Sequence, residues 1–542
     1  MSDSDAADAP LQRTLSDTAL ALANTLLTQP GHHAAQARQL LCGLGRAIAG
    51  GEHPAALLQD ARFSHPGWRG PLRRRLLSAW NTCSRHSHAW ADGLQLGTTD
   101  RARLDWLLRQ LDEAASPANS PLCPRFAERL RESRGRSLQQ GLRLLAQDLA
   151  LKRALPAQSP DNALLVGRDM ACTPGDVVRR EALFELIQYR PTTARTAERP
   201  LLIIPPPLNR FYLLDMTPAN SLVRHALDQG LQVFMLSWRN PNPSHCEWGL
   251  QAYVEAAATA LDTSLKISGS DQATLLGVCA GGLIGLLLQG WLQARGQAGL
   301  VAAGSYLITP IDARLDNDPM FIASPEVRRA LRNRVWRQGC LGPRQLAAGF
   351  AWLLPRQLIW TPLLKRYTLG EENPLHPVRV WNQDSTRLPA RLVDDLLRVF
   401  EEDWFAGDRP IDFFGTPLDL RQITTPSWHL GAATDHIVPW ANSYPGERLG
   451  GDRTFVLSSG GHIQSLLNQP GLPRSWYQTA HVKTADPRQW AAEAPRQRGS
   501  WWPQWSGWIK DHSGRTVTAP ASTGNADYPA LYAAPGRYVH QS

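Results

Sequence analysis

Hydrophobic and polar residues follow different patterns in the two parts of this chain, and the pattern changes near residue 195. Before that point, apolar residues recur every three or four positions, as at 104–111 and 137–149. This spacing places them on one face of a helix. Breaks rich in Pro, Ser and Asn, such as 115–121, separate the helical stretches. The pattern therefore predicts a mainly helical N-terminal domain over residues 1–195.

After residue 195, short apolar runs alternate with helical patterns. Strands are predicted where such runs end at turn-forming residues, at 201–204, 231–236, 273–278, 306–309, 427–430 and 454–457. Helices are predicted between the earlier strands, at 220–229 and 250–267. Apolar strands that alternate with helices are typical of a parallel sheet covered on both faces, so residues 196–542 are predicted to form one α/β domain.

Residues 312 to about 400 interrupt this alternation. They are helical in pattern and rich in Trp, Arg and Pro, with apolar runs at 350–354 and 358–364. An insertion between two late strands lies at the sheet edge where ligands bind in α/β folds, so we expect a mobile cap over the site. The apolar runs need a surface that buries them, such as the core, a bound product or a second subunit of a homodimer.

The composition narrows the class of protein. The chain has 542 residues, 43% hydrophobic and 19% charged, which supports a large core and excludes a disordered chain. Its acidic, polar first residues do not resemble an export signal. Seven scattered cysteines without a CxxC pair argue against a zinc ribbon or a disulfide framework and favour a reducing, cytoplasmic setting.

Two further features, an uncharged stretch and the net positive charge, could be misinterpreted as a membrane segment and a nucleic-acid-binding surface. Residues 272–294 carry no charge, but their five glycines and three glutamines favour a strand, a tight turn and a buried helix over a transmembrane segment. The net charge of +9 comes from dispersed arginines without a nucleic-acid module, so we expect a solvated surface and no nucleic-acid partner. The same field would attract a polyanionic substrate such as a coenzyme A thioester.

The strongest chemical signal is Gly277-Val-Cys-Ala-Gly-Gly282, between a predicted strand and an apolar helix. It is the G-x-S-x-G nucleophile elbow with cysteine in place of serine, and its glycines permit the strained turn that exposes the nucleophile. The N-terminus of the following helix favours a thiolate at Cys279 and offers the amide of Ala280 to an oxyanion. The alternative interpretation is a structural cysteine at a Gly-rich bend.

An acid and a histidine follow in the order that this elbow requires. Asp435 comes after the strand predicted at 427–430, and His462 after the strand predicted at 454–457. Alone, each could be a turn or loop residue. Together they predict a triad of Cys279, Asp435 and His462, in which the histidine moves the thiol proton and the carboxylate orients it. His436 is the alternative candidate for the base, but it ranks lower because it lies on the same loop as Asp435.

The second oxyanion amide is expected from the loop after the strand at 201–204. Pro205, Pro206 and Pro207 have no N–H group, so Leu208 or Asn209 must supply the amide, and we take Leu208 together with Ala280. A merely rigid turn is the alternative. No HExxH motif, ligand-spaced Cys/His pair or GxxxxGK[ST] loop occurs, so no metal, cofactor or nucleotide hydrolysis is expected.

These residues resemble a known family, the polyhydroxyalkanoate synthases, which polymerise (R)-3-hydroxyacyl-CoA into storage polyester. The cysteine elbow joined to Ser237-Trp-Arg-Asn-Pro241 is highly specific for this family. The chain is most similar to the single-subunit, medium-chain type of pseudomonads. The other matching segments are 173–175, 184–189, 206–212, 381–384, 434–437, 461–465, 499–503 and 534–540.

The resemblance implies an α/β-hydrolase fold with a cap insertion and an acyltransferase without a cofactor. Cys279 would hold the growing chain as a thioester, His462 would activate nucleophiles, and Asp435 would support the histidine or help to activate the incoming 3-hydroxyl. The implied setting is the cytoplasmic surface of polyester granules, with granule-associated proteins as partners, although residues 1–50 diverge. A thioesterase or simple acyltransferase with the same triad and a non-catalytic granule-surface protein are the alternatives.

Overall fold

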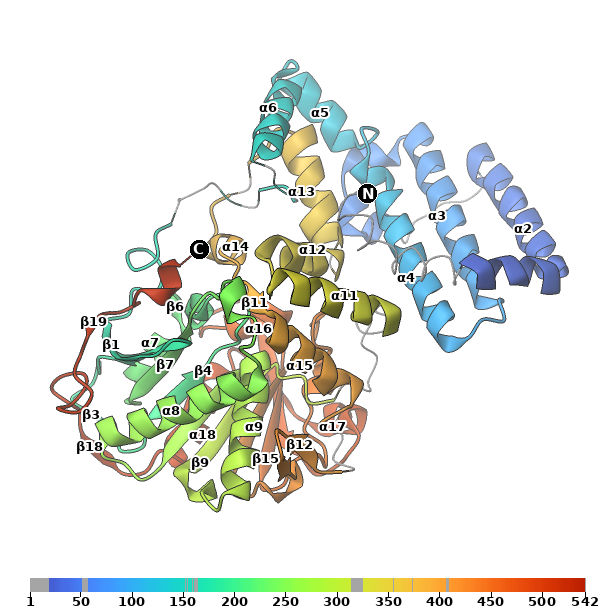
Figure 1. Cartoon of the computed structure of the whole chain (residues 1–542). Coiled ribbons are helices and arrows are strands. Elements are labelled where there is room, and N and C mark those ends of the chain that lie inside the picture. Colours follow the sequence, from blue (N-terminus) through green and yellow to red (C-terminus); the bar gives the residue numbers. More distant parts are fainter. Residues whose placement is uncertain are drawn as a thin grey trace. The chain divides into compact units, whose positions relative to one another are not determined.

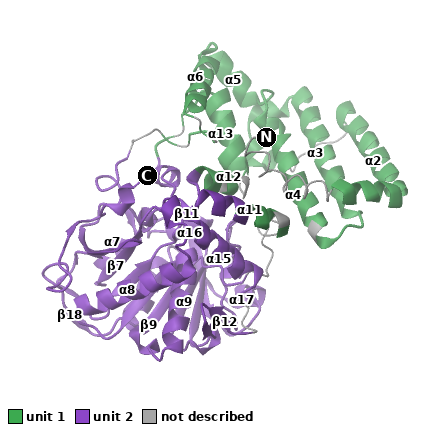
Figure 2. Ribbon diagram, viewed as in Figure 1, with its two compact units in different colours: residues 1–161, 318–331, 344–375 green, residues 162–317, 332–343, 376–542 purple. Residues whose placement is uncertain are grey.

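The computed structural model of this chain (Figure 1) divides into two compact units (Figure 2). It describes residues 19–50, 57–151, 153, 155–157, 159, 164–312, 325–353, 355–372, 374–405 and 409–541. The first unit contains residues 1–161, 318–331 and 344–375, and the second contains residues 162–317, 332–343 and 376–542.

The first unit is helical, and its helices come from two distant parts of the chain. The helices predicted around 104–111 and 137–149 are confirmed within α4 and α6. The elements are α2 (Pro30–Ala49), α3 (Pro71–Asp92), α4 (Thr98–Ala114), α5 (Pro124–Glu132) and α6 (Arg136–Ala150), followed by α12 (Pro343–Leu353), α13 (Thr361–Leu363) and π-helical turns at Arg356–Trp360 and Leu364–Thr368.

A buried carboxylate joins these two parts within the first unit. Asp148 on α6 accepts hydrogen bonds from Arg366 Nε (2.7 Å) and from the hydroxyl of Tyr367 (2.8 Å). Burial raises the pKa of Asp148, but these hydrogen bonds outweigh it and lower the pKa. The expected cap at 312–400 is thus shared between the two units, and its residues 313–324 lie outside the described residues. A cap over the site stays a prediction.

The second unit is built on an eleven-stranded sheet. Its strand order is β17-β16-β15-β14-β9-β8-β4-β7-β2-β1-β19, and the strands from β15 to β7 run parallel. The parallel strands are β4 (Leu201–Ile204), β7 (Val233–Trp238), β8 (Ala273–Val278), β9 (Val301–Leu307), β14 (Ser427–Ala432) and β15 (Arg453–Ser458), and the others are β1 (Gly175–Arg180), β2 (Phe184–Tyr189), β16 (Trp476–His481), β17 (Arg496–Arg498) and β19 (Tyr532–Ala533).

Helices cover both faces of this sheet (Figure 1). Neighbouring residues of β9 point to opposite faces: Tyr306 donates to Gln289 of α9, whereas Ser305 accepts from the indole of Trp505 on α18. The buried indoles of Trp428, Trp501 and Trp505 fill the α18 side of the core. The sheet and its cover confirm the predicted α/β class. The covering helices are α7 (Leu222–Asp228), α8 (Leu250–Ser268), α9 (Ala280–Ala294) and α18 (Trp502–Asp511).

The strands predicted around the site are found, but the one predicted at 306–309 is β9, which spans Val301–Leu307. The strands predicted at 201–204 and 273–278 have these bounds in the structure, and residues 272–294 form β8, a sharp turn and α9. Among the described residues, no helix combines the length and the apolar character needed to span a bilayer.

The N-terminal segment of the first unit ends at residue 161, whereas the sequence pattern places the boundary at 195. Strands β1 and β2 explain the difference. They pair with each other, and β2 pairs with β7 from Phe184 opposite Trp238 to Gln188 opposite Phe234. Residues 175–189 therefore belong to the main sheet and are not part of the helical region.

Candidate active site

Cys279 occupies the sharp turn between β8 and α9. Its backbone has φ 51° and ψ −122°, a strained conformation for a residue with a side chain. Its amide donates to the carbonyl of Leu307 on the neighbouring strand (2.9 Å), which holds the turn against the sheet. The thiol consequently lies at the carboxyl edge of the parallel strands and at the N-terminus of α9, as a nucleophile elbow requires.

The glycines around Cys279 are required by close backbone packing. A Cβ atom at Gly277 would lie 2.6 Å from the Cα atom of Gly282. A Cβ atom at Gly281 would collide with the carbonyl of Ile204, and one at Gly282 would collide with the side chain of Thr309. The helix can therefore start this close to β4 and β9 only because these positions carry no side chain.

Asp435 lies on the loop after β14, and its side chain is fully buried. Its Oδ2 atom accepts a hydrogen bond of 2.7 Å from Nδ1 of His462. Its Oδ1 atom accepts the backbone amides of Ile437 (2.8 Å) and Val438 (2.9 Å). Both oxygens are thus engaged, and the carboxylate has one orientation.

His462 begins the short helix α16 (His462–Leu466) directly after β15 and is also buried. The loops of the acid and the histidine are tied together, because the amide of Thr434 donates to the carbonyl of Gly460 (2.9 Å). With Nδ1 bound to Asp435, the other ring nitrogen is left to face Cys279.

The two histidines near Asp435 differ in charge. Burial lowers the pKa of His462, but its hydrogen bonds with Asp435 and Cys279 outweigh burial and raise the pKa to about 10. Burial lowers the pKa of His436, Asp435 opposes this effect, and the positive charge of His462 adds to it. At neutral pH His462 is therefore a cation beside the thiol, the partner that stabilises a thiolate, whereas His436 is neutral.

The sequence predicts two amides for an oxyanion, one from Ala280 and one from Leu208 or Asn209. Ala280 is the first residue of α9, a position whose N–H has no acceptor within the helix. The amide of Asn209 donates to Oγ1 of Thr386 (2.9 Å), so it is engaged. The amide of Leu208 donates none of the hydrogen bonds found within the described stretches. Of the two residues that the sequence left open, Leu208 is thus the one whose amide has no acceptor within the described stretches, and its role as an oxyanion donor stays a prediction.

The sequence reasoning did not find Thr386. Its hydroxyl accepts the amide of Asn209 and donates to the carbonyl of Pro207 (3.4 Å), so it holds the loop that carries Leu208. The only signal was the neighbouring segment 381–384, which resembles the polymer synthases but had no assigned role.

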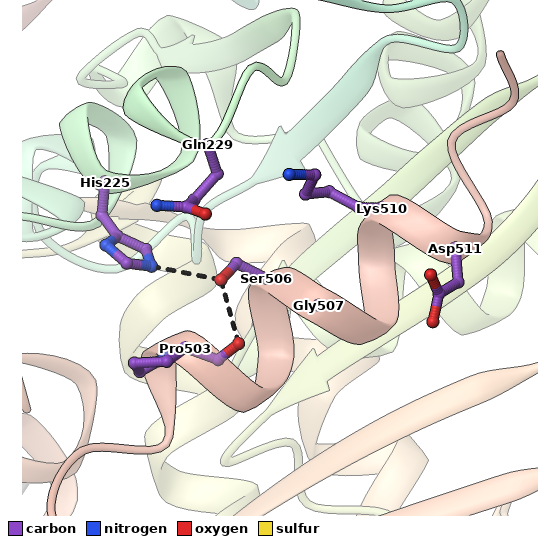
Figure 3. A pocket seen from close by; sticks show the side chains of 7 residues that line it. All are labelled: His225, Gln229, Pro503, Ser506, Gly507, Lys510 and Asp511. Carbon is purple, nitrogen blue, oxygen red and sulfur yellow. Dashed lines mark hydrogen bonds between the residues drawn. The ribbon is translucent and has the colours of Figure 1, made fainter. Parts of the chain in front are cut away.

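A surface hollow of about 370 Å³ lies elsewhere, between α7 and α18 (Figure 3). Nε2 of His225 lies 3.4 Å from Oγ of Ser506, but that hydroxyl donates to the carbonyl of Pro503 (3.1 Å). The pair therefore lacks the geometry of a nucleophile and its base. Burial lowers the pKa of His225, in keeping with a packing role. The lining residues are His225, Gln229, Pro503, Ser506, Gly507, Lys510 and Asp511.

Comparison with known proteins adds independent information. The family model described as "Poly-beta-hydroxybutyrate polymerase (PhaC) N-terminus" matches residues 59–226, and the model "alpha/beta hydrolase fold" matches residues 214–469. Poly(3-hydroxyalkanoate) polymerase 2 of Ectopseudomonas oleovorans is 40% identical over 97% of this chain and 94% of its own length. Polymerase 1 of the same organism is 35% identical over 98% and 95%. The polymerase subunit PhaC of Cupriavidus necator is 35% identical over 92% and 86%.

Proposed function

Because this chain belongs to the poly(3-hydroxyalkanoate) polymerase family, we propose that it is an acyltransferase that polymerises (R)-3-hydroxyacyl-CoA into a polyester and releases CoA. The observation that supports this proposal most directly is the hydrogen bond of 2.7 Å between His462 and Asp435. The histidine that it orients also bonds to Cys279, which stands on a strained elbow. This arrangement suits acyl transfer through a thioester.

The first step acylates the enzyme. The thiolate of Cys279 attacks the carbonyl carbon of the hydroxyacyl thioester, and a new C–S bond forms. The amides of Ala280 and Leu208 stabilise the negative charge on the carbonyl oxygen. The bond to the CoA sulfur then breaks, and CoA leaves with the proton of His462. Acylated Cys279 and neutral His462 remain.

The second step forms the ester. The 3-hydroxyl of an incoming hydroxyacyl-CoA attacks the Cys279 thioester, His462 takes the hydroxyl proton, and the Cys279 thiolate leaves. The lengthened chain, now a CoA thioester, returns to Cys279 by the first step. Both oxygens of Asp435 are engaged by His462 and two amides, which favours a supporting role over direct activation of the hydroxyl.

We further propose that the enzyme prefers medium-chain acyl groups, on the basis of the resemblance to the pseudomonad type. An apolar acyl pocket gains about 0.8 kcal/mol for each CH₂ group that it buries. A ten-carbon substrate should therefore be used much better than a four-carbon one. Equal or better specificity for the shorter substrate would contradict this preference.

Incubation with four-carbon and ten-carbon (R)-3-hydroxyacyl-CoA tests the function, with CoA release and polymer measured in the same reaction. Polymer with release of CoA supports the proposal. Release of CoA with free hydroxy acid alone would indicate a thioesterase. Neither CoA release nor polymer would indicate a non-catalytic granule-surface protein.

We also infer that the enzyme works as a homodimer at the surface of its polyester product in the cytoplasm, where it contacts granule-associated proteins. This setting follows from the family and the expected apolar product. Light scattering of the purified chain tests the dimer. Fractionation of polymer granules from producing cells tests the location, and recovery of the enzyme only in the granule-free fraction would contradict it.

A further inference from the structure

The loop at 205–210, which carries Leu208, is held on both sides of that residue. Asn209 has a positive φ of 63°, so the loop backbone is also strained next to Leu208. Indole and hydroxyl groups from two other segments bind its backbone. These bonds run from Trp238 Nε1 to the carbonyl of Pro205 (2.8 Å), from Thr386 Oγ1 to the carbonyl of Pro207 (3.4 Å), from the Asn209 amide to Thr386 Oγ1 (2.9 Å), and from Trp381 Nε1 to the carbonyl of Arg210 (2.9 Å).

Arg210 ends this loop, and its side chain is only 4% exposed. Its guanidinium donates to three acceptors from two distant segments. They are Oδ1 of Asp384 (3.2 Å), the carbonyl of Tyr538 (3.2 Å) and the carbonyl of Gln541 (2.5 Å). Oδ2 of Asp384 accepts the hydroxyl of Tyr212 (2.8 Å), so the carboxylate is bound from both sides. One buried cation thus joins the loop to residues 538–541.

The segment that supplies these carbonyls is itself fixed to the sheet. Glu185 on β2 is fully buried, and its Oε2 atom accepts the amides of Arg537 (2.9 Å) and Tyr538 (3.0 Å). Its Oε1 atom accepts the hydroxyl of Tyr532 (2.6 Å). A Cβ atom at Gly536 would collide with this carboxylate, and its φ of 88° is one that glycine adopts readily. Glu185 therefore sets where the carbonyls of 538 and 541 stand.

Asn240 adds a second link between the same segments. Its Nδ2 atom donates to the carbonyl of Gln541 (3.1 Å), and its Oδ1 atom accepts the amide of Arg387 (2.9 Å). Four segments that resemble the polyhydroxyalkanoate synthases thus meet at this loop. The steps of the proposed reaction use only the one that contains Leu208 and assign no role to the other three. The four segments are 206–212, 237–241, 381–384 and 534–540.

We propose that Arg210 is a positioning residue that aims the amide of Leu208 at the oxyanion, through Asp384 and the carbonyls of Tyr538 and Gln541. The inference rests on the proposed function, because it requires Leu208 as an oxyanion donor. An oxyanion donor must be placed to within about 0.5 Å. A planar guanidinium can hold three acceptors in fixed directions, whereas the single ammonium of lysine cannot reproduce that fork.

The test is the Arg210→Lys variant, measured in two ways on the full-length chain. The first is single-turnover acylation of Cys279 by ten-carbon (R)-3-hydroxyacyl-CoA. The second is the rate at which iodoacetamide alkylates Cys279, read by mass spectrometry of its peptide. We expect acylation to slow by about 10- to 100-fold, because one oxyanion donor is displaced. KM and alkylation should stay within about twofold of wild type, since neither needs the oxyanion hole.

Arg453→Lys is the matched control. Arg453 also binds two loop carbonyls, those of Gly446 and Leu449, but at the amino end of β15, the sheet edge opposite Cys279. This variant should acylate at the wild-type rate. If acylation slowed equally in Arg210→Lys and Arg453→Lys, a general loss of structure would explain the effect, and the inference would be overturned.

Glu185→Gln provides a second variant, which acts on the loop through residues 537–541, whose amides the Glu185 carboxylate accepts. Acylation should be slower in this variant, whereas the rate of alkylation should be unchanged. If circular dichroism shows that Arg210→Lys does not fold, Glu185→Gln replaces it in the test. The double variant should be no slower than the slower single variant, because both changes break one network. Wild-type acylation in Arg210→Lys, a parallel loss of alkylation, or multiplied losses in the double variant would overturn the inference. Failure of the proposed function can be distinguished from failure of this inference, because Cys279 would then stay unacylated in the wild-type protein as well.

Discussion

Nδ1 of His462 lies 2.7 Å from Oδ2 of Asp435, although the two residues stand on separate loops after neighbouring parallel strands. The other oxygen of Asp435 is bound by two amides of its own loop. The carboxylate therefore cannot turn away from the imidazole without breaking three hydrogen bonds. This fixed pair directs the histidine toward Cys279, and a change at any of the three residues should affect the other two.

Replacement of Cys279 by alanine should stop acyl transfer without unfolding the protein. CoA release should fall by at least about 1,000-fold, since no other group can take the place of the nucleophile. Mass spectrometry after incubation with labelled hydroxyacyl-CoA should find the acyl group on Cys279 in wild type only. Cys246→Ala, at another half-buried cysteine, should leave both measurements unchanged. A labelled acyl group on a different residue of the Cys279→Ala variant would refute the assignment.

His462 should outrank His436 as the catalytic base. His462→Gln should lower kcat by about 100-fold or more, because the proton on the thiol and on the leaving CoA then has no carrier. His436→Gln should lower kcat by less than about tenfold, since His436 is neutral and both oxygens of Asp435 are bound elsewhere. Steady-state kinetics of the two variants measure this difference. The reverse order of the two losses would make His436 the base.

The dependence of protein stability on pH should reveal the interaction between His462 and Asp435. The pKa of His462 is raised from its ordinary value of 6.5 to about 10, so this imidazole keeps in the folded state a proton that it releases in the unfolded chain. The stabilisation that this imidazole contributes is complete below pH 6.5 and is lost as the pH rises toward 10. Asp435→Asn removes the main partner and should flatten this pH dependence in urea unfolding between pH 6.5 and 9. Equal slopes in both proteins would contradict the raised pKa.

Gly281→Ala should destabilise the protein, because the added Cβ would meet the backbone carbonyl of Ile204. We expect a loss of about 1–3 kcal/mol in the free energy of unfolding, together with a loss of activity from the displaced elbow. Gly507→Ala on α18 is the control, since its Cβ would meet no atom within 4 Å. That change should stabilise the helix by up to about 1 kcal/mol. Equal effects of the two changes in urea unfolding would mean that the elbow tolerates a side chain.

The strands and the elbow were predictable because their physical demands are local. The turn at Cys279 needs glycines within three residues, and these leave a mark in the sequence whatever the rest of the chain does. Buried parallel strands need continuous apolar runs, so 201–204 and 273–278 could be bounded by composition alone. The candidate acid and base then follow from their places after later strands.

The division into units was not predictable, because it depends on contacts between distant residues. Strand β2 is a strand of the main sheet through its pairing with β7, about 50 residues later. Asp148 and Arg366 are 218 residues apart, and neither carries a local pattern that names its partner. The support of the Leu208 loop by Arg210 and Gln541 escapes sequence reasoning for the same reason, since a carbonyl acceptor can belong to any residue type.

The supports of Arg210 also enter the chain long after the loop that they hold. The carbonyls of Tyr538 and Gln541 enter the chain 328 and 331 residues after Arg210. A ribosome that adds about 5–20 residues per second needs roughly 15–65 s for that stretch. During this interval the nucleophile and then its acid and histidine are synthesised, while the loop that carries Leu208 still lacks its last anchors. A positioning role for Arg210 thus makes the complete support of the Leu208 loop a late event of biosynthesis.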